Sequence, residues 1–148
     1  MNNEIEWINK NEELDENEIK YVEDILYIKF PEDYISCIRN NDGAYPVPDT
    51  FNIQNDEETL NNLLSLHKDK GNFLLQVYEN VKDRMLEKII PFARDPFGNL
   101  LCFDYRDDVQ PTIVFWEHER AFNNKENAIS FICNTFSELL NMLHESEE

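Results

Sequence analysis

The chain has 148 residues, the common size of a single domain, which is enough to bury roughly two-thirds of the surface exposed by the unfolded chain. Its 31 acidic and 13 basic side chains leave a formal charge of −18. This field repels phosphate backbones and anionic lipids, so nucleic acids and membranes are disfavoured as partners, whereas a basic protein is attracted. A plain role in solubility explains the charge equally well.

The ends of the chain and its cysteines indicate the compartment. The first residues contain neither a basic nor an apolar run typical of a secretory signal, and no stretch is long and apolar enough to span a bilayer. We expect one cytoplasmic domain over residues 1–148, with fraying at 1–12 and 145–148. Three cysteines in apolar stretches predict buried thiols and no disulfide framework. These are Cys37, Cys102 and Cys133.

Two helices are predicted in the first third of the chain. Asp15, with Glu18 three residues on, has the form of a capping box, and apolar residues then recur at helical spacing as far as Leu26. Pro31 suits the first position of a second helix. The turn-forming sequence Asn41-Asp42-Gly43 ends that helix.

The middle of the chain mixes loop, strand and helix signals. Two prolines and a glycine around residues 44–49 indicate a loop, and residues 50–53 alternate as a strand does. Asp56 suits the cap of a short helix that we expect to run to Leu66. A further amphipathic pattern predicts a helix over residues 72–86.

The last third begins with three short runs of β-branched and aromatic residues, at 89–93, 100–103 and 112–116. Turn residues separate them, so they predict an antiparallel meander. Apolar residues from Ile129 to Leu143 recur at helical intervals and predict a C-terminal helix. The fold expected is therefore α+β, with an antiparallel sheet of about four to six strands flanked by N-terminal helices and a C-terminal helix.

Six short segments, spread over nearly the whole chain, match one family in order and spacing. They are Phe30-Pro31-Glu32-Asp33-Tyr34; Asn41-Asp42-Gly43; Ile90-Pro91-Phe92-Ala93-Arg94-Asp95 with Gly98-Asn99; Cys102-Phe103-Asp104; Val114-Phe115-Trp116-Glu117-His118-Glu119; and Ala128-Ile129-Ser130-Phe131. Together they resemble the SUKH superfamily, in its Smi/Knr-like branch. Tyr27 stands where that branch usually has a glycine in the first helix, and Asp42 replaces one glycine of a usual pair.

The resemblance implies an antiparallel sheet flanked by helices and a role in protein binding. Bacterial members of this kind are cytoplasmic immunity proteins, which block a cognate toxin, often a nuclease, of a polymorphic toxin system. The charge favours the same role, because a nuclease presents a basic cleft that an acidic surface can occupy. Two alternatives stay open: a scaffold or regulator of cell-wall (glucan) synthesis, as in fungal relatives, and an acidic mimic of nucleic acid.

The predicted contact surface consists mainly of acids that follow neighbouring strands. The alternative interpretation of these acids is a solvated rim that binds no partner. The alternative for Trp116 is a position in the core. The predicted partner-binding residues are Asp42, Asp104, Asp107, Asp108, Trp116, Glu117, His118 and Glu119. The oligomeric state is not indicated by any pattern in the chain.

Enzymatic chemistry is disfavoured by what surrounds the polar residues. A group of carboxylates with one histidine has oxygen ligands of the type that a divalent cation prefers. It lacks the second histidine of a zinc-protease helix, and Asp95 suits a structural role accepting backbone hydrogen bonds in its own turn. The group is Asp95, Asp104, Glu117, His118 and Glu119. We expect no catalytic residue, no cofactor and no metal.

Overall fold

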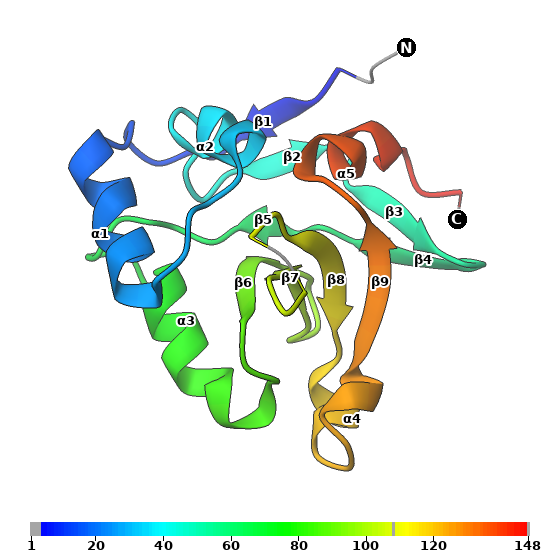
Figure 1. The fold of residues 1–148 in the computed structure, drawn as a ribbon. Coiled ribbons are helices and arrows are strands. Elements are labelled where there is room, and N and C mark those ends of the chain that lie inside the picture. The colour runs from blue at the N-terminus through cyan, green and yellow to red at the C-terminus, as the bar shows by residue number, and fades with distance from the viewer. Residues whose placement is uncertain (1–3, 108, 148) are drawn as a thin grey trace.

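A computed structural model describes residues 4–107 and 109–147, and in this part of the chain a five-stranded antiparallel sheet carries the fold, in the order β5-β6-β7-β8-β9 (Figure 1). Two smaller antiparallel pairs, β1-β2 and β3-β4, lie beside it. The elements in chain order are β1 (Glu6–Ile8), α1 (Glu16–Leu26), α2 (Glu32–Ile38), β2 (Tyr45–Val47), β3 (Thr50–Ile53), β4 (Asp56–Thr59), β5 (Asn62–Leu63), α3 (Leu74–Val81), η1 (Lys82–Arg84), β6 (Ile89–Arg94), β7 (Leu100–Asp104), β8 (Thr112–Trp116), α4 (His118–Ala121), η2 (Glu126–Ala128), β9 (Ile129–Cys133) and α5 (Phe136–Met142).

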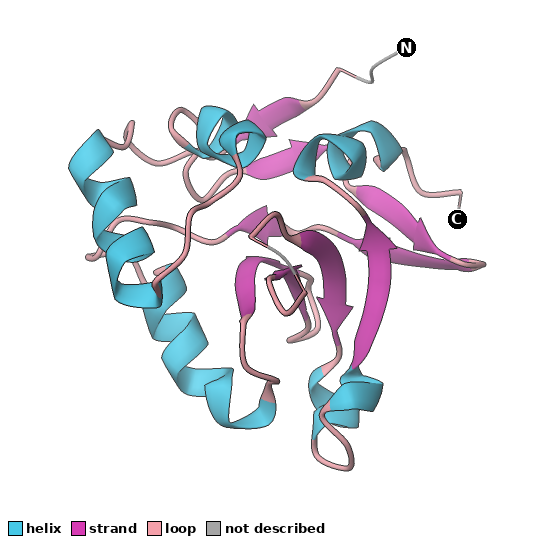
Figure 2. Cartoon of the chain, viewed as in Figure 1, coloured by secondary structure: helices cyan, strands magenta, loops and turns pink. Residues whose placement is uncertain are grey.

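The α+β architecture is confirmed, and Figure 2 shows helices placed around the strands. The predicted meander is also confirmed, since β6, β7 and β8 pair in sequence order. No helix among the described residues is long and apolar enough to cross a membrane.

The first helix forms where its capping box predicts. Asp15 accepts a hydrogen bond from the Glu18 backbone N–H at 2.9 Å, and the Glu18 carboxylate accepts from the Asp15 N–H at 3.1 Å. The helix ends at Tyr27, which adopts the left-handed conformation with φ 58°. This is the conformation that a glycine takes most easily, and here a 94% exposed tyrosine adopts it.

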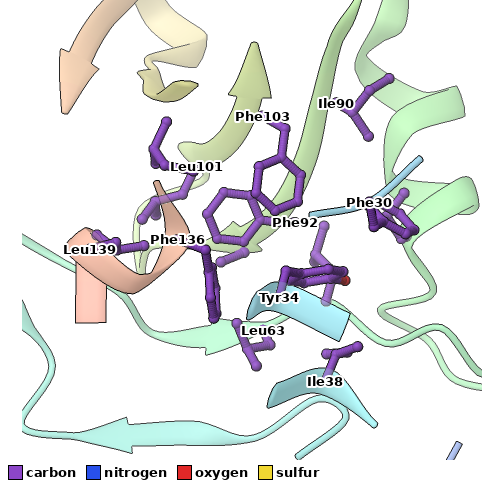
Figure 3. Packing of buried hydrophobic residues seen from close by; sticks show 14 of the residues in the cluster. Phe30, Tyr34, Ile38, Leu63, Ile90, Phe92, Leu101, Phe103, Phe136 and Leu139 are labelled. Carbon is purple, nitrogen blue, oxygen red and sulfur yellow. The ribbon is translucent and has the colours of Figure 1, made fainter. Parts of the chain in front are cut away.

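One face of the sheet carries the main core. Phe92 and Phe103 on neighbouring strands stack with ring centroids 4.3 Å apart. Tyr34 from α2 meets Phe103 edge-on at 5.1 Å and Phe136 from α5 at 5.5 Å (Figure 3). Apolar area removed from water stabilises a fold by roughly 25 cal/mol per Å², so this aromatic cluster joins α2 and α5 firmly to β6 and β7.

The opposite face carries a second, smaller core. Alternate residues of β8 belong to different clusters: Ile113 and Phe115 lie in the main core, and Val114 and Trp116 in the smaller one. This alternation follows from the two-residue period of a strand. Side chains of α3, α4 and η2 cover this face, so β8 is buried on both sides.

Two predicted helices are wrong in whole or in part. The stretch 56–66 forms β4 and β5, because a tight turn with Gln54 at φ 57° folds β4 back onto β3, and β5 then pairs with β6. Residues 129–133, expected to begin the last helix, form β9 along β8. A short apolar stretch can fit a helix or a strand, and only the pairing with a distant strand decides between them.

The last helix begins at a signal that the sequence contains. Thr135 and Glu138 form a second capping box, in which Thr135 Oγ1 accepts a hydrogen bond from the Glu138 N–H at 3.0 Å.

Near the other end of the chain, residues 6–8 form β1, which pairs with β2, although this range lies within the segment expected to fray. The predicted loop at 44–49 therefore contains a short strand.

Candidate protein-interaction surface

The turn between β6 and β7 is held by Asp95, as predicted. Its carboxylate accepts hydrogen bonds from the backbone N–H groups of Phe97 and Asn99, both at 2.8 Å, and from the Asn99 side chain at 2.9 Å. Gly98 supplies a positive φ of 93°. Because Asp95 is only 3% exposed, its oxygens serve the turn and not a partner.

His118, a predicted contact residue, also serves this turn. Its backbone N–H donates to the Asn99 side-chain oxygen at 3.0 Å, and its Nε2 donates to the Phe97 carbonyl at the same distance. A Cβ at Gly98 would lie 3.2 Å from the His118 ring. The histidine therefore packs α4 against the β6–β7 turn.

Negative charge gathers near this turn, where Glu58 of β4 lies within electrostatic reach of Asp95 and Glu117. Partial burial raises the pKa of Glu58. Repulsion from the carboxylates of Asp95, Glu117 and Asp56 raises this pKa further. Glu117 was predicted as a contact residue, but its neighbours on β4 were missed because 56–66 was expected to be a helix. Glu119, an exposed acid, follows on α4. We use the name acidic edge for four residues: Asp56, Glu58, Glu117 and Glu119.

The acidic edge has little compensating positive charge. Among residues 4–107 and 109–147, no basic side chain forms an ion pair with Asp56, Glu58 or Glu119. Glu117 has one long contact, 3.6 Å, to the exposed Arg120. A group of like charges left in this state favours the approach of cations from outside the molecule.

The acids after β7 behave differently. Arg106 donates to Asp104 through Nε at 3.0 Å and Nη2 at 2.8 Å, and its backbone N–H adds a third bond at 3.0 Å. Burial works to raise the pKa of Asp104, but these contacts with Arg106 hold it below its usual value. Asp107 is exposed, and Asp108 lies outside the described residues.

The predicted group of five possible metal ligands does not converge. In the antiparallel register Asp104 pairs with Thr112 at one end of the β7–β8 hairpin, while Leu100 pairs with Trp116 at the other end, directly before Glu117. Among the residues described, no three His, Cys, Asp or Glu side chains are arranged to hold a metal ion. The residues do follow neighbouring strands, but Asp104 lies at the opposite end from Asp95, Glu117 and His118, because adjacent antiparallel strands end on opposite sides.

Two predicted contact residues are buried and are corrected here. Asp42 is fully buried and accepts hydrogen bonds from Ser65, Leu66 and Asn11. Trp116 is fully buried in the smaller core, with its indole N–H donating to the Arg84 carbonyl at 3.3 Å. Turn composition and position at a strand end did not distinguish an exposed side chain from a buried one at either residue.

The model of the SMI1 / KNR4 family (SUKH-1) matches residues 13–142 of this chain. The matched segment extends from just before α1 to the end of α5. The chain belongs to the SMI1 / KNR4 family. The resemblance predicted from six short segments is therefore confirmed. Comparison with curated proteins found no match.

The cysteines of this SUKH-1 domain are all thiols. Burial raises the pKa of Cys37 to about 12 and that of Cys133 to about 12 as well. Cys102 is completely buried, and its pKa is raised well above the usual value. These thiols stay protonated at neutral pH and are poor nucleophiles.

An open groove of about 860 Å³ lies beside the C-terminal end of α1, and the sequence did not indicate it. Its lining is largely apolar and includes Ile25 and Tyr105. Charges of both signs, such as Asp24 and Lys88, also line it. The groove of this SUKH-1 domain therefore lacks the one-sided charge of the acidic edge.

Proposed function

We propose that this protein is an immunity protein, which binds and neutralises a cognate toxin domain with a basic, nuclease-like surface. Membership of the SMI1 / KNR4 family supports a role in binding proteins. The acidic edge supports the choice of a basic partner, because Asp56 and Glu117 repel Glu58 and, among the described residues, the only ion pair of these four acids is the long contact from Glu117 to Arg120.

The proposed mechanism is occlusion of a basic cleft. Lysine or arginine side chains of the toxin bind Asp56, Glu58, Glu117 and Glu119, which relieves the repulsion at Glu58 and covers the substrate-binding surface of the toxin. Charge complementarity of this kind raises the association rate and disfavours wrong partners. Asp107 extends the acidic surface at the other end of the hairpin.

The first test is co-expression with the toxin-like domain encoded beside this gene. We expect rescue of growth and co-purification of a one-to-one complex. If neither rescue nor a complex is observed, the alternative function is favoured, namely a scaffold or regulator of cell-wall synthesis. The family name covers regulators of this kind as well.

A charge-reversal variant then locates the surface. Replacing Asp56, Glu58 and Glu117 by Lys is expected to weaken binding by about tenfold or more and to flatten its dependence on salt. A matched control has the same change in net charge at three exposed acids elsewhere, namely Glu13→Lys, Asp69→Lys and Glu87→Lys.

The control separates local contacts from the overall field. If both triple variants lose affinity equally, the net charge of −18 steers the toxin and the acidic edge makes no special contact. If the variant at the acidic edge binds like the parent, the proposed surface is wrong. Surface plasmon resonance at several ionic strengths measures both outcomes.

A further inference from the structure

His67, just after β5, lies between two oxygen acceptors. The residue is only 9% exposed. Its Nδ1 is 2.6 Å from the Glu18 carboxylate, and its Nε2 is 2.8 Å from the Glu12 carbonyl oxygen. A neutral imidazole has one N–H, so one of its nitrogens would turn a lone pair toward an oxygen. The geometry fits a ring that carries both protons.

A buried carboxylate nearby requires a countercharge. Asp42 is fully buried and accepts from Ser65 Oγ at 2.6 Å, Leu66 N–H at 2.7 Å and the Asn11 side chain at 2.9 Å. His67 Nε2 lies 3.9 Å from Asp42, and within the described residues it is the only basic group at ion-pair distance from this carboxylate. Burying an unpaired charge is costly, so the pair favours an imidazolium.

The remaining charged groups around the ring are already engaged. Glu18 uses its second oxygen for the capping box at the start of α1. Lys68, the next residue in the chain, places its ammonium 3.7 Å from the centre of the Tyr21 ring. The charges that act on His67 are therefore Glu18 from α1 and Asp42 from the connection after α2.

These contacts join segments that are distant in the sequence. The chain ahead of α1 also bonds to the residues that follow α2, through Asn11 N–H to the Asp42 carbonyl at 2.8 Å and Leu14 N–H to the Arg39 carbonyl at 2.9 Å. Figure 1 shows this chain passing beside α2 before α1 begins. His67 adds the side-chain link from the 65–67 segment.

We propose that His67 is a proton-dependent latch: as an imidazolium it holds residues 11–18 against Asp42 and the 65–67 segment, and loss of one proton opens this contact. In the neutral ring one nitrogen faces an oxygen without a proton between them. Asp42 then also loses its countercharge. The start of α1 is released first, because Glu18 links its capping box to the ring.

The direction of the pH response follows from the contacts. Burial works to lower the pKa of His67, but the Glu12 carbonyl, the Glu18 carboxylate and Asp42 raise it overall. A raised folded-state pKa means that the latch contributes fully below the unfolded value of about 6.5 and is lost as the pH rises through the folded value. The latch therefore opens on alkalinisation.

Nuclear magnetic resonance on the wild-type protein tests the protonation state directly. We expect ¹⁵N shifts of the His67 ring to show both nitrogens protonated at pH 6, with a titration midpoint above about 6.5. Amide-exchange protection of residues 11–18, corrected for intrinsic rates, falls through the same midpoint. Each unit of difference between folded and unfolded pKa corresponds to about a tenfold change in the opening equilibrium.

Two variants complete the test. In His67→Gln, protection of residues 11–18 is expected to be low and independent of pH. The control His144→Gln, which changes a histidine near the C-terminus that contacts Asn52, is expected to keep the wild-type pH dependence. A His67 ring that is neutral at pH 6, or protection that does not change through its titration, would overturn the latch. The wild-type titration decides the matter even if His67→Gln does not fold.

Discussion

Asp42 and Glu58 are both acids in tight surroundings, yet their environments are opposite. Asp42 is fully buried among three hydrogen-bond donors and beside His67. Glu58 lies half-buried among the carboxylates of Asp56, Asp95 and Glu117. An acid surrounded by donors is part of the fold, whereas one surrounded by acids is available to an external cation. Net charge alone does not distinguish the two.

The largest effect is expected at Asp42. Replacement by Ala leaves two buried donors without their acceptor and the His67 imidazolium without its nearby countercharge, so we expect the free energy of unfolding to fall by about 3–5 kcal/mol. The matched control is Asp24→Ala, at an exposed acid whose ion pair with Lys20 spans 3.6 Å, and it should cost under about 0.5 kcal/mol. Urea denaturation at pH 7 measures both. Equal losses would break the comparison.

A smaller effect is expected at Asp95. Its charge acts on Glu58 of the acidic edge, but its carboxylate is buried and accepts several hydrogen bonds, as that of Asp42 does. Asp95→Ala removes three hydrogen bonds of the β6–β7 turn and should lower the free energy of unfolding by about 1–3 kcal/mol. Asp95→Asn, which keeps one acceptor oxygen, should lose less. A loss no larger than that of the exposed Asp69→Ala would place Asp95 with the surface acids instead.

The smallest effect, and one of opposite sign, is expected at Glu58. Its raised pKa means that the ionised form disfavours the fold at neutral pH, so Glu58→Gln should stabilise the protein by about 0.3 kcal/mol at pH 7. The advantage should disappear as the pH falls through the folded-state pKa, where the native side chain gains a proton. Thermal unfolding of the variant and the parent, with Glu13→Gln as control, measures the difference at each pH. A destabilised Glu58→Gln would show that its neighbours do not repel it.

Local sequence signals predicted the elements that depend on neighbouring residues. The capping box at Asp15 and Glu18 positions α1, and the turn residues Asp95 and Gly98 join β6 to β7, as expected. The second capping box, at Thr135 and Glu138, was present in the sequence but was overlooked, because the apolar spacing ahead of it also fits a helix.

The elements that sequence patterns missed depend on distant partners. Strand β4 forms against β3, and β9 against β8, although both segments also fit a helical pattern. His67 follows a segment that was predicted as a helix, and the fold buries it between the segment before α1 and Asp42. The bonds that join it to Glu12 and Glu18 cross 55 and 49 residues of sequence, which include α1, α2 and strands β2 to β5, so no local window contains them.

The sequence by itself determined the α+β class, the meander, the family and the strong negative charge, because periodicity, turn chemistry and composition are properties of neighbouring residues. Only the tertiary structure decided which acids remain at the surface. Long-range contacts buried Asp42 and Trp116 and brought Glu58 of β4 close enough to Glu117 for repulsion, whereas Asp104 is paired locally, with Arg106 two residues on. Burial and the proximity of charges are set by contacts between distant segments, which composition does not record.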